Sequence, residues 1–445
     1  MNNKKSIFLS IIFIFTTLIV VAQPKDNSPY SRYGLGDPVD NNFVYFRTTG
    51  LSGAFYNPYQ INVVNPASNG YLRATVFDIG LYAKYAGLKT NSNSTGIYSG
   101  NLEYISLGIP LINPINDLLE KKVRKYDIGL TFTLMPASIV GYDVSSDEER
   151  EGIGIIRRTY KGTGGTYKFM TGLGGRYNNF SFGFNVGYFF GKINYDREIL
   201  FPGLNNPYSN NYHTDFSVNG FIYNVGTIYN VVLNKKELKE KENTGVKKLI
   251  FGIYGNTKTN FKTKGTVVNT STIYDVNSPS TTTDTVYSDK NKSGTGTLPV
   301  NFGGSIIYND KDKYIFGVDF SKSLWNQYTN DIKPDNLKDS YKISIGGQYT
   351  PDINSYTNYF KRVNYGMGIY YQTDPRSEGD NQFEEKGIHF GMGLPFVFKR
   401  KISRINLDLN FGNRGSNLSI SENFVKFSLS VTFNDTEWFV KRKYY

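Results

Sequence analysis

The feature that most constrains the fold is a strict alternation of apolar and polar residues that recurs along residues 75–434. The alternation is clearest near the C-terminus, where Val425, Phe427, Leu429, Val431 and Phe433 alternate with Lys426, Ser428, Ser430 and Thr432. A period of two is typical of a strand with one face buried, and many such segments of about ten residues are the signature of a membrane barrel.

Similar alternation appears in at least seven other segments: Thr75–Ala86, Tyr126–Leu134, Phe180–Phe190, Tyr314–Phe320, Tyr341–Tyr349, Val363–Tyr371 and Arg404–Phe411. Further candidates lie near 100–109, 154–162, 165–177, 212–232, 246–268, 282–308 and 387–396. We therefore predict an all-β fold, a transmembrane antiparallel β-barrel of about 14 strands spanning residues 75–434. A large soluble β-protein is the alternative, but no fixed repeat indicates a propeller or a β-helix.

Composition supports the barrel. Mean hydropathy is polar (−0.40), yet aromatic residues reach 16%, with 36 Tyr and 32 Phe. A lipid-facing surface rich in aromatic residues and a polar lumen would produce this combination. The chain has no Cys, which excludes disulfides, thiol catalysis and thiolate metal sites together.

Residues 1–22 are predicted to be a signal peptide. Lys4 and Lys5 precede an apolar run that begins at Ile7 and ends at Val20-Val21-Ala22, so cleavage is expected before Gln23. An uncleaved membrane anchor is the alternative, because the run is only slightly short for a membrane span. Export predicts location in the cell outer membrane. The basic residues are dispersed rather than gathered in one stripe, so we expect outer-membrane lipids and no nucleic acid as anionic neighbours.

Residues 23–74 are predicted to form a lead-in and a hatch inside the barrel. Their central stretch, Arg47–Leu72, contains two Asn-Pro steps, and such steps favour turns. The residues expected to shape the hatch are Gly50, Gly53, Asn57, Asn65, Pro66 and Ala67. An irregular segment rich in glycine and proline before the first strand of a barrel is best accommodated in the lumen.

Within that stretch, GLSGAFYNPYQINVVNPAS resembles the FadL/OmpP1 family of outer-membrane channels for long-chain fatty acids and other hydrophobic molecules. It also resembles the PorV-type barrel subunits of type 9 secretion in Bacteroidota. The FadL resemblance implies a 14-stranded barrel plugged by an N-terminal hatch. The matching positions are Asn65, Pro66 and Ala67, and an ordinary turn with no hatch role is the alternative.

The connections and the tail complete the expected topology. Leu111–Lys125 is expected to be a periplasmic turn with a short helix, and Thr257–Thr297 a long polar hairpin reaching outward. Residues 435–445 form an aromatic and basic tail that resembles the C-terminal signature of Bacteroidota outer-membrane barrels. Its Trp438 and Phe439 are predicted to lie at the membrane interface.

Glycines on the predicted lumen face have two explanations, room for a hatch or local strand curvature. The positions are Gly183, Gly187, Gly317, Gly346, Gly366 and Gly368.

Nothing in the sequence predicts enzyme chemistry. The two histidines, His213 and His389, are far apart, and no nucleophile elbow, HExxH motif or phosphate loop is present. We expect a protein that is not an enzyme and has neither cofactor nor metal. Calcium binding at Asp147-Glu148-Glu149 is the minor alternative to a solvated acidic turn.

Two functions therefore remain open. The first is a FadL-like outer-membrane channel for small hydrophobic molecules, gated by the N-terminal hatch. The second is a non-enzymatic barrel subunit of a secretion or assembly complex, as in type 9 secretion, with a large outer-membrane translocon subunit as partner. A channel requires an apolar pocket in the lumen and a break in strand pairing, whereas a complex subunit tolerates a sealed lumen.

Overall fold

The computed structural model describes residues 28–90, 93–122, 124–204, 207–240, 245–274, 281–398, 401–415 and 419–438. The predicted signal peptide and Phe439 lie outside these residues.

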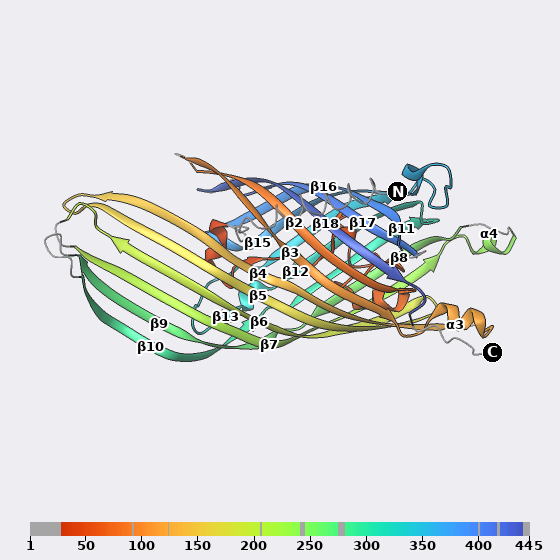
Figure 1. Ribbon diagram of the computed structural model, residues 1–445, viewed down its shortest axis with the longest axis horizontal. Coiled ribbons are helices and arrows are strands. Elements are labelled where there is room, and N and C mark those ends of the chain that lie inside the picture. The colour runs from red at the N-terminus through yellow and green to blue at the C-terminus, as the bar shows by residue number, and fades with distance from the viewer. Residues whose placement is uncertain are drawn as a thin grey trace, which may run out of the picture.

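The alternating segments form one closed antiparallel sheet (Figure 1). Its first strands are β2 (Thr75–Lys89), β3 (Ser94–Pro110), β4 (Tyr126–Arg150), β5 (Gly154–Tyr177), β6 (Phe180–Leu200), β7 (Tyr208–Val232), β8 (Lys247–Asn256) and β9 (Thr259–Tyr274). The later strands are β10 (Thr281–Leu298), β11 (Asn301–Asp310), β12 (Tyr314–Ser323), β14 (Ser340–Tyr349), β15 (Asn364–Glu378), β16 (Asn381–Phe398), β17 (Lys401–Arg414) and β18 (Ser421–Asp435). Pairing of β18 with β2, from Ser421↔Lys89 to Asp435↔Thr75, closes the sheet into a barrel.

The barrel has 14 strands, as predicted. β8 and β9 pair with successive parts of β7, so together they make one interrupted barrel strand. β10 pairs with β9 and β11 pairs with β8, so β10 and β11 make a second interrupted strand. Two short strands, β1 (Asp37–Pro38) and β13 (Thr329–Asn330), add to the sheet without crossing the barrel.

One boundary prediction was wrong. Residues 154–162 and 165–177 were expected to be separate strands, but β5 is continuous through Gly162–Gly165. Gly164 and Gly165 have φ of +117° and +152°, which only glycine adopts readily, so the chain bends here without ending the strand.

Short helices lie in the turns and in the N-terminal segment, which we define as residues 28–74. They are η1 (Pro29–Arg32), α2 (Val44–Arg47), η2 (Pro66–Tyr71), α3 (Pro114–Leu119), α4 (Lys235–Glu240), η3 (Trp325–Gln327) and η4 (Tyr359–Arg362). α3 confirms the short helix expected in residues 111–125. Among the described residues, no helix is long and apolar enough to cross a membrane.

Tyrosines on the outer surface form two belts around the barrel, as expected of a protein that spans a lipid bilayer. One belt contains Tyr126, Tyr177, Tyr229, Tyr308, Tyr314, Tyr349 and Tyr365, and the other contains Tyr85, Tyr98, Tyr167, Tyr188, Tyr223, Tyr341 and Tyr371. The first belt is near the end with α3, α4 and the short turns, which in outer-membrane barrels faces the periplasm. We call this the periplasmic end and the other the outer end.

The wall is much taller on one side (Figure 1). Strands β4–β7 have 21–25 residues, whereas β12 and β14 have 10. With β9 and β10, these long strands form what we call the tall wall. The predicted polar hairpin at 257–297 is its β9–β10 part. Above the outer tyrosine belt its outward residues become polar, for example Lys192, Asn194 and Asp196 on β6, so the tall wall extends beyond the membrane.

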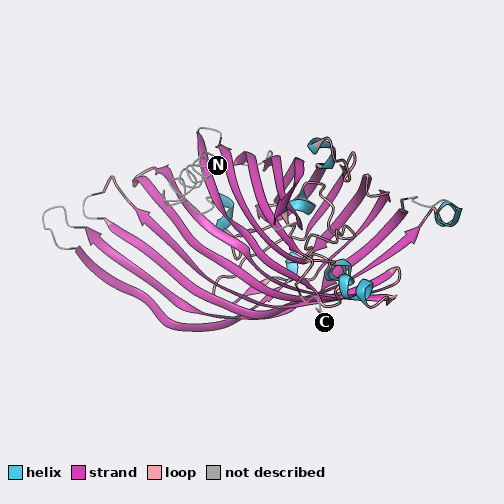
Figure 2. Ribbon diagram, turned by 45° about the vertical axis from the view of Figure 1, so that its right-hand side comes forward, coloured by secondary structure: helices cyan, strands magenta, loops and turns pink. Residues whose placement is uncertain are grey.

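The N-terminal segment packs against the inner face of the barrel. Figure 2 shows short helices and loops enclosed by the strands. Its helix η2 contacts β3–β7, and α2 contacts β16–β18. Phe43, Phe46, Leu51, Ile61 and Ala67 are almost fully buried in an apolar cluster that also includes inward residues of the wall, such as Ile228 and Ile307. This segment therefore packs inside the barrel, and its role as a hatch stays a prediction.

Candidate functional site

The Asn65-Pro66-Ala67 turn anchors the N-terminal segment to β5–β8. The Asn65 carboxamide oxygen accepts from the backbone N–H of Ala67 at 3.1 Å, which caps η2. Its amide nitrogen donates to the carbonyl oxygens of Gly53 and of Thr227 on β7. One buried side chain therefore joins two loops of the segment to the wall.

Two wall asparagines hold the residues just before this turn. Asn185 on β6 donates to the carbonyl oxygen of Val63, and Asn224 on β7 donates to that of Val64, both at 2.9 Å. These bonds satisfy backbone groups that irregular structure would otherwise leave unpaired in the interior.

Gly50 and Gly53 contact the next part of the wall, at β12 and β14. The carbonyl oxygen of Gly50 accepts from Ser344 on β14, and the N–H of Gly53 donates to the Asp319 carboxylate on β12 at 2.7 Å. Gly50 has a φ of +67°, which favours glycine. Asn57 is less central: it donates to the Tyr45 hydroxyl at 2.9 Å and caps the turn at Tyr59.

We expect Asn65→Ala to destabilise the protein by about 2–4 kcal/mol, because it removes a helix cap and leaves buried backbone groups without partners. Asn57→Ala, at a half-buried position, should cost only about 1 kcal/mol. Thermal unfolding in detergent, followed by the change in electrophoretic mobility, compares the two variants. Equal midpoints would contradict the central role of Asn65.

The lumen glycines differ in what surrounds them. A Cβ at Gly183 would overlap Pro66, and at Gly346, Gly366 and Gly368 it would meet Thr48 or Thr49, so these four make room for the N-terminal segment. At Gly187 the nearest atoms belong to Phe169 and Met170 of the neighbouring strand, and at Gly317 they belong to the wall residues Ile306 and Ile307 and to Leu51 of the segment.

A buried ion pair joins the N-terminal segment to β3. The Arg47 guanidinium donates to both carboxylate oxygens of Glu103 at 2.7 Å, and both side chains are 4% exposed. Lys426 on β18 contacts the same carboxylate at 2.6 Å. Beside this pair, the Phe43 ring stacks on Tyr104 of β3 with centroids 3.7 Å apart.

A second group of charges lies nearer the outer end. Asp37 in β1 pairs with Arg376 of β15 at 2.7 Å and with Arg414 of β17 at 3.1 Å, and Arg414 also pairs with Glu385. Burial by itself would raise the pKa of Asp37, but the nearby Arg414 and Arg376 lower it well below its ordinary value. Asp37 is therefore held ionised between β15 and β17, two strands that are far from it in the sequence.

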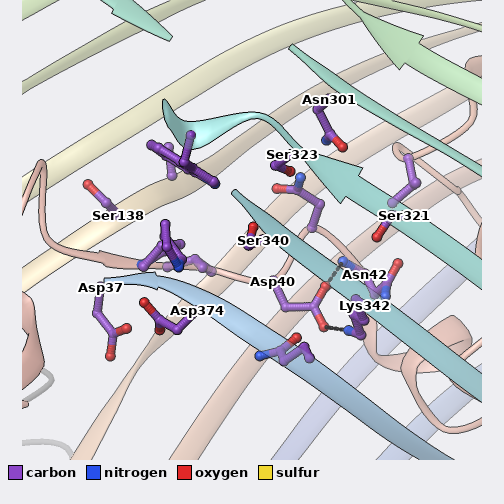
Figure 3. Close-up of a pocket in the computed structure, with 18 of the residues that line it drawn as sticks. Asp37, Asp40, Asn42, Ser138, Asn301, Ser321, Ser323, Ser340, Lys342 and Asp374 are labelled. Carbon is purple, nitrogen blue, oxygen red and sulfur yellow. Dashed lines mark hydrogen bonds and ion pairs between the residues drawn. The ribbon is translucent and has the colours of Figure 1, made fainter. Parts of the chain in front are cut away.

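These charged groups line a chamber of about 500 Å³ between the N-terminal segment and the wall (Figure 3). The chamber wall also carries hydroxyl and amide groups from Ser138, Asn301, Ser321, Ser323 and Ser340. On the segment side, Asp40 accepts from Lys342 at 3.0 Å. Apolar residues such as Met170, Phe189 and Leu298 also line the chamber, so its lining is mixed and not continuously apolar.

Strand pairing breaks between β3 and β4, both of which are fully described. They pair only from Ile105↔Leu134 to Pro110↔Gly129, which leaves residues 94–104 of β3 apart from β4. We call this separation the β3–β4 gap. A pocket of about 590 Å³ lies in it, lined by Ile97 and Tyr98 from β3 and by Val144 and Ser145 from β4.

The N-terminal segment occupies the edge of β4 beside this gap. β1 pairs with Ser138 and Ile139, and the N–H of Ser28 donates to the carbonyl oxygen of Gly141 at 2.8 Å. Pro29 lines the gap pocket, while Leu35 to Asn42 line the chamber. Residues 29–38 therefore border both spaces.

An apolar cluster at the outer end leads to the gap. It joins Leu35 of the segment to the inner face of the tall wall and to the inward-folded β12–β14 connection. Its buried members are Leu35, Val140, Tyr142, Phe189, Ile193, Tyr195, Phe216, Val218, Phe261, Tyr328 and Ile332. Val144 packs against this cluster and also lines the gap pocket.

The candidate catalytic and metal residues have structural partners. His389 lies beside Asp408 at 3.1 Å in the buried wall, and His213 pairs with Asp196 on the tall wall. Asp147 and Glu148 pair with Arg157 and Arg158 of β5, so their charges are already matched. The described residues contain no group of three or more acids and histidines placed to hold a metal.

Trp438 lies at the periplasmic end, half exposed, and its carbonyl oxygen accepts from Asn113 at 3.1 Å. The role of Trp438 at the membrane interface stays a prediction.

The closed 14-stranded barrel with an irregular N-terminal segment defines the class: a FadL-like outer-membrane barrel. A FadL homologue from Pseudomonas aeruginosa has the same fold with a TM-score of 0.57 and 13% identity, covering 90% of this chain and 99% of that chain. The toluene transporter TbuX from Ralstonia pickettii has a TM-score of 0.51 and 12% identity, covering 90% of this chain and 98% of that chain. A mutant of the TodX monoaromatic hydrocarbon channel has a TM-score of 0.52 and 13% identity, covering 88% of this chain and 99% of that chain.

The family model named BamG matches residues 3–445, and the chain therefore belongs to the BamG family. No curated protein sequence matches it. The resemblance to PorV-type subunits stays a prediction.

The important interior residues that sequence reasoning missed are charged. Asp37, Arg47, Glu103, Arg376 and Arg414 were not singled out, because each pairs with residues that lie far away along the chain. One signal was present: Glu103 alternates in phase with the apolar Ile105 and Leu107, where a charge would need a partner. A register shift opposite Gly80 and Leu81 turns it inward.

Proposed function

We propose that this protein is an outer-membrane channel that passes small hydrophobic molecules sideways through the β3–β4 gap, with the N-terminal segment as its gate. The observation that carries the proposal is that residues 29–38 lie between the chamber and the gap pocket while bonding to the edge of β4. The similar barrels, a toluene transporter and a monoaromatic hydrocarbon channel, support this class of ligand.

The proposed route starts at the apolar cluster of the outer end. An apolar ligand would gain free energy by leaving water there, since burial of apolar surface is favourable. From Tyr142 and Val144 it would move into the gap pocket, which lies at the outer tyrosine belt beside Tyr98, and from there between β3 and β4 into the membrane. The chamber below mixes apolar residues such as Met170 and Phe189 with charged ones, and displacing water from charged groups is costly. The sideways route is therefore favoured over the route down the lumen.

Tethering across the gap tests this route. The chain has no Cys, so Thr95→Cys and Ser145→Cys, which both line the gap pocket, can be joined by a bis-maleimide without side reactions. We expect the tether to abolish uptake of a labelled monoaromatic hydrocarbon by cells that produce the protein. The matched control joins Ser145→Cys to Thr159→Cys, its registered neighbour on β5, and should leave uptake unchanged. Equal uptake by both tethered proteins would refute the sideways route.

The second interpretation, a subunit of a secretion or assembly complex with a translocon partner, remains a prediction. A sealed lumen would suit that role. The chamber and the gap favour the channel instead.

A further inference from the structure

The connection between β14 and β15, residues 350–363, displays apolar side chains at the periplasmic end. Tyr356 is 98% exposed, Phe360 69%, Ile353 57% and Tyr359 40%. The connection projects beyond the strands (Figure 1). Isolated exposed apolar residues are ordinary, but four within eight positions of one turn mark an interaction surface.

This connection has a defined structure. The N–H of Asp352 donates to the carbonyl oxygen of Lys361 at 2.8 Å, and the Asn358 side chain caps η4 by accepting from the N–H of Phe360 at 3.0 Å. Asp352 also accepts from the N–H of Asn354 at 3.0 Å. Because these bonds fix the backbone, the apolar side chains are held outward rather than being free to collapse onto the barrel.

The connection is continuous with the lipid-facing surface. The Tyr365 hydroxyl, in the periplasmic tyrosine belt, donates to the carbonyl oxygen of Phe360 at 3.1 Å. On the other side, the N–H of Thr350 donates to the carbonyl oxygen of Lys313, next to the stacked belt residues Tyr314 and Tyr349. The exposed apolar residues therefore extend a surface that already faces lipid.

Positive charge accompanies the apolar residues. Lys361 is exposed, Arg362 lies 5.3 Å from the Tyr359 ring centroid, and Lys313 lies 5.4 Å from that of Tyr314. Within residues 350–363, Asp352 is the only acid. Aromatic rings with Lys and Arg beside them are the combination that suits the boundary between acyl chains and phosphate headgroups.

We propose that the β14–β15 connection inserts into the headgroup layer of the periplasmic leaflet and binds anionic phospholipid there. Tyr356, Phe360 and Ile353 enter the boundary with the acyl chains, while Lys361 and Arg362 contact the phosphates. This surface is separate from the β3–β4 gap, so it does not depend on the proposed transport function.

Fluorescent labelling tests the proposal. Tyr356→Cys is labelled with an environment-sensitive nitrobenzoxadiazole dye, in full-length mature protein reconstituted into phosphatidylcholine vesicles with or without phosphatidylglycerol. The control is Lys236→Cys on α4, an exposed position at the same end of the barrel. We expect the Tyr356 label to emit at shorter wavelength than the Lys236 label, and to be quenched by a nitroxide attached near the lipid headgroup.

Charge dependence provides the second measurement. Phosphatidylglycerol should increase the quenching of the Tyr356 label, and Lys361→Gln in the labelled protein should reduce that increase. A Tyr356 label as water-exposed as the Lys236 label would overturn the proposal and point to a periplasmic protein as the partner of this surface. Equal quenching with and without phosphatidylglycerol would overturn the preference for anionic lipid.

Discussion

Arg47→Ala is expected to destabilise the folded protein by about 3–5 kcal/mol, because it leaves the buried Glu103 carboxylate without its bidentate partner. Lys426 still contacts Glu103, but it belongs to the wall and not to the N-terminal segment. The variant should therefore also loosen the unpaired part of β3 from the segment. Thermal unfolding in detergent measures the first effect, and leakage of small solutes from proteoliposomes measures the second.

Arg157→Ala is the matched control. Arg157 makes a similar bidentate contact with Asp147, at 2.8 Å, but both side chains are about half exposed on the tall wall. Exposed pairs contribute only about 0–1 kcal/mol. Similar losses of stability in the two variants would show that burial does not make the Arg47–Glu103 pair more important than an exposed pair. Replacing Arg47, Glu103 and Lys426 together by Met removes all three charges of the group, and it should recover much of the stability without restoring the polar link.

Deleting Arg47–Leu72 should convert the barrel into an open pore. These residues include the Asn65 turn and the buried Leu51, Phe55 and Ile61, so the deletion empties much of the inner cross-section. Planar bilayer recordings should then show steady, porin-like conductance where the intact protein shows little. Heat-dependent electrophoretic mobility verifies that the barrel has folded.

A second deletion provides the control for the first. Removing residues 147–156 shortens the tall wall without touching the N-terminal segment, and it should leave conductance low. If the Arg47–Leu72 deletion is folded and its conductance is also low, the gate function of the N-terminal segment is wrong.

The regular part of the wall was predictable because alternation is a local property. The pattern from Val425 to Phe433 identifies β18 without any knowledge of its partners, and similar segments gave the correct number of strands. The boundary error at Gly162–Gly165 arose because glycine both interrupts strands and bends them.

The candidate site was only partly predictable. The position of Asn65 and Pro66 in an unusual turn was visible, since Asn-Pro steps restrict the backbone locally. The bonds of Asp37 to Arg376 and Arg414 were not, because they join residues more than 300 positions apart. The β3–β4 gap was equally hidden, because β3 keeps strand geometry along residues 94–104 even where β4 is not its partner.

The links between the N-terminal segment and the last strands have a consequence for how the protein matures. Asp37 needs Arg414, and Arg47 shares Glu103 with Lys426, so these early charges find all their partners only when β18 pairs with β2. Until then they would stand in the interior as costly unpaired ions. Docking of the segment and closure of the barrel are therefore one cooperative event, which occurs late because its contacts span nearly the whole chain.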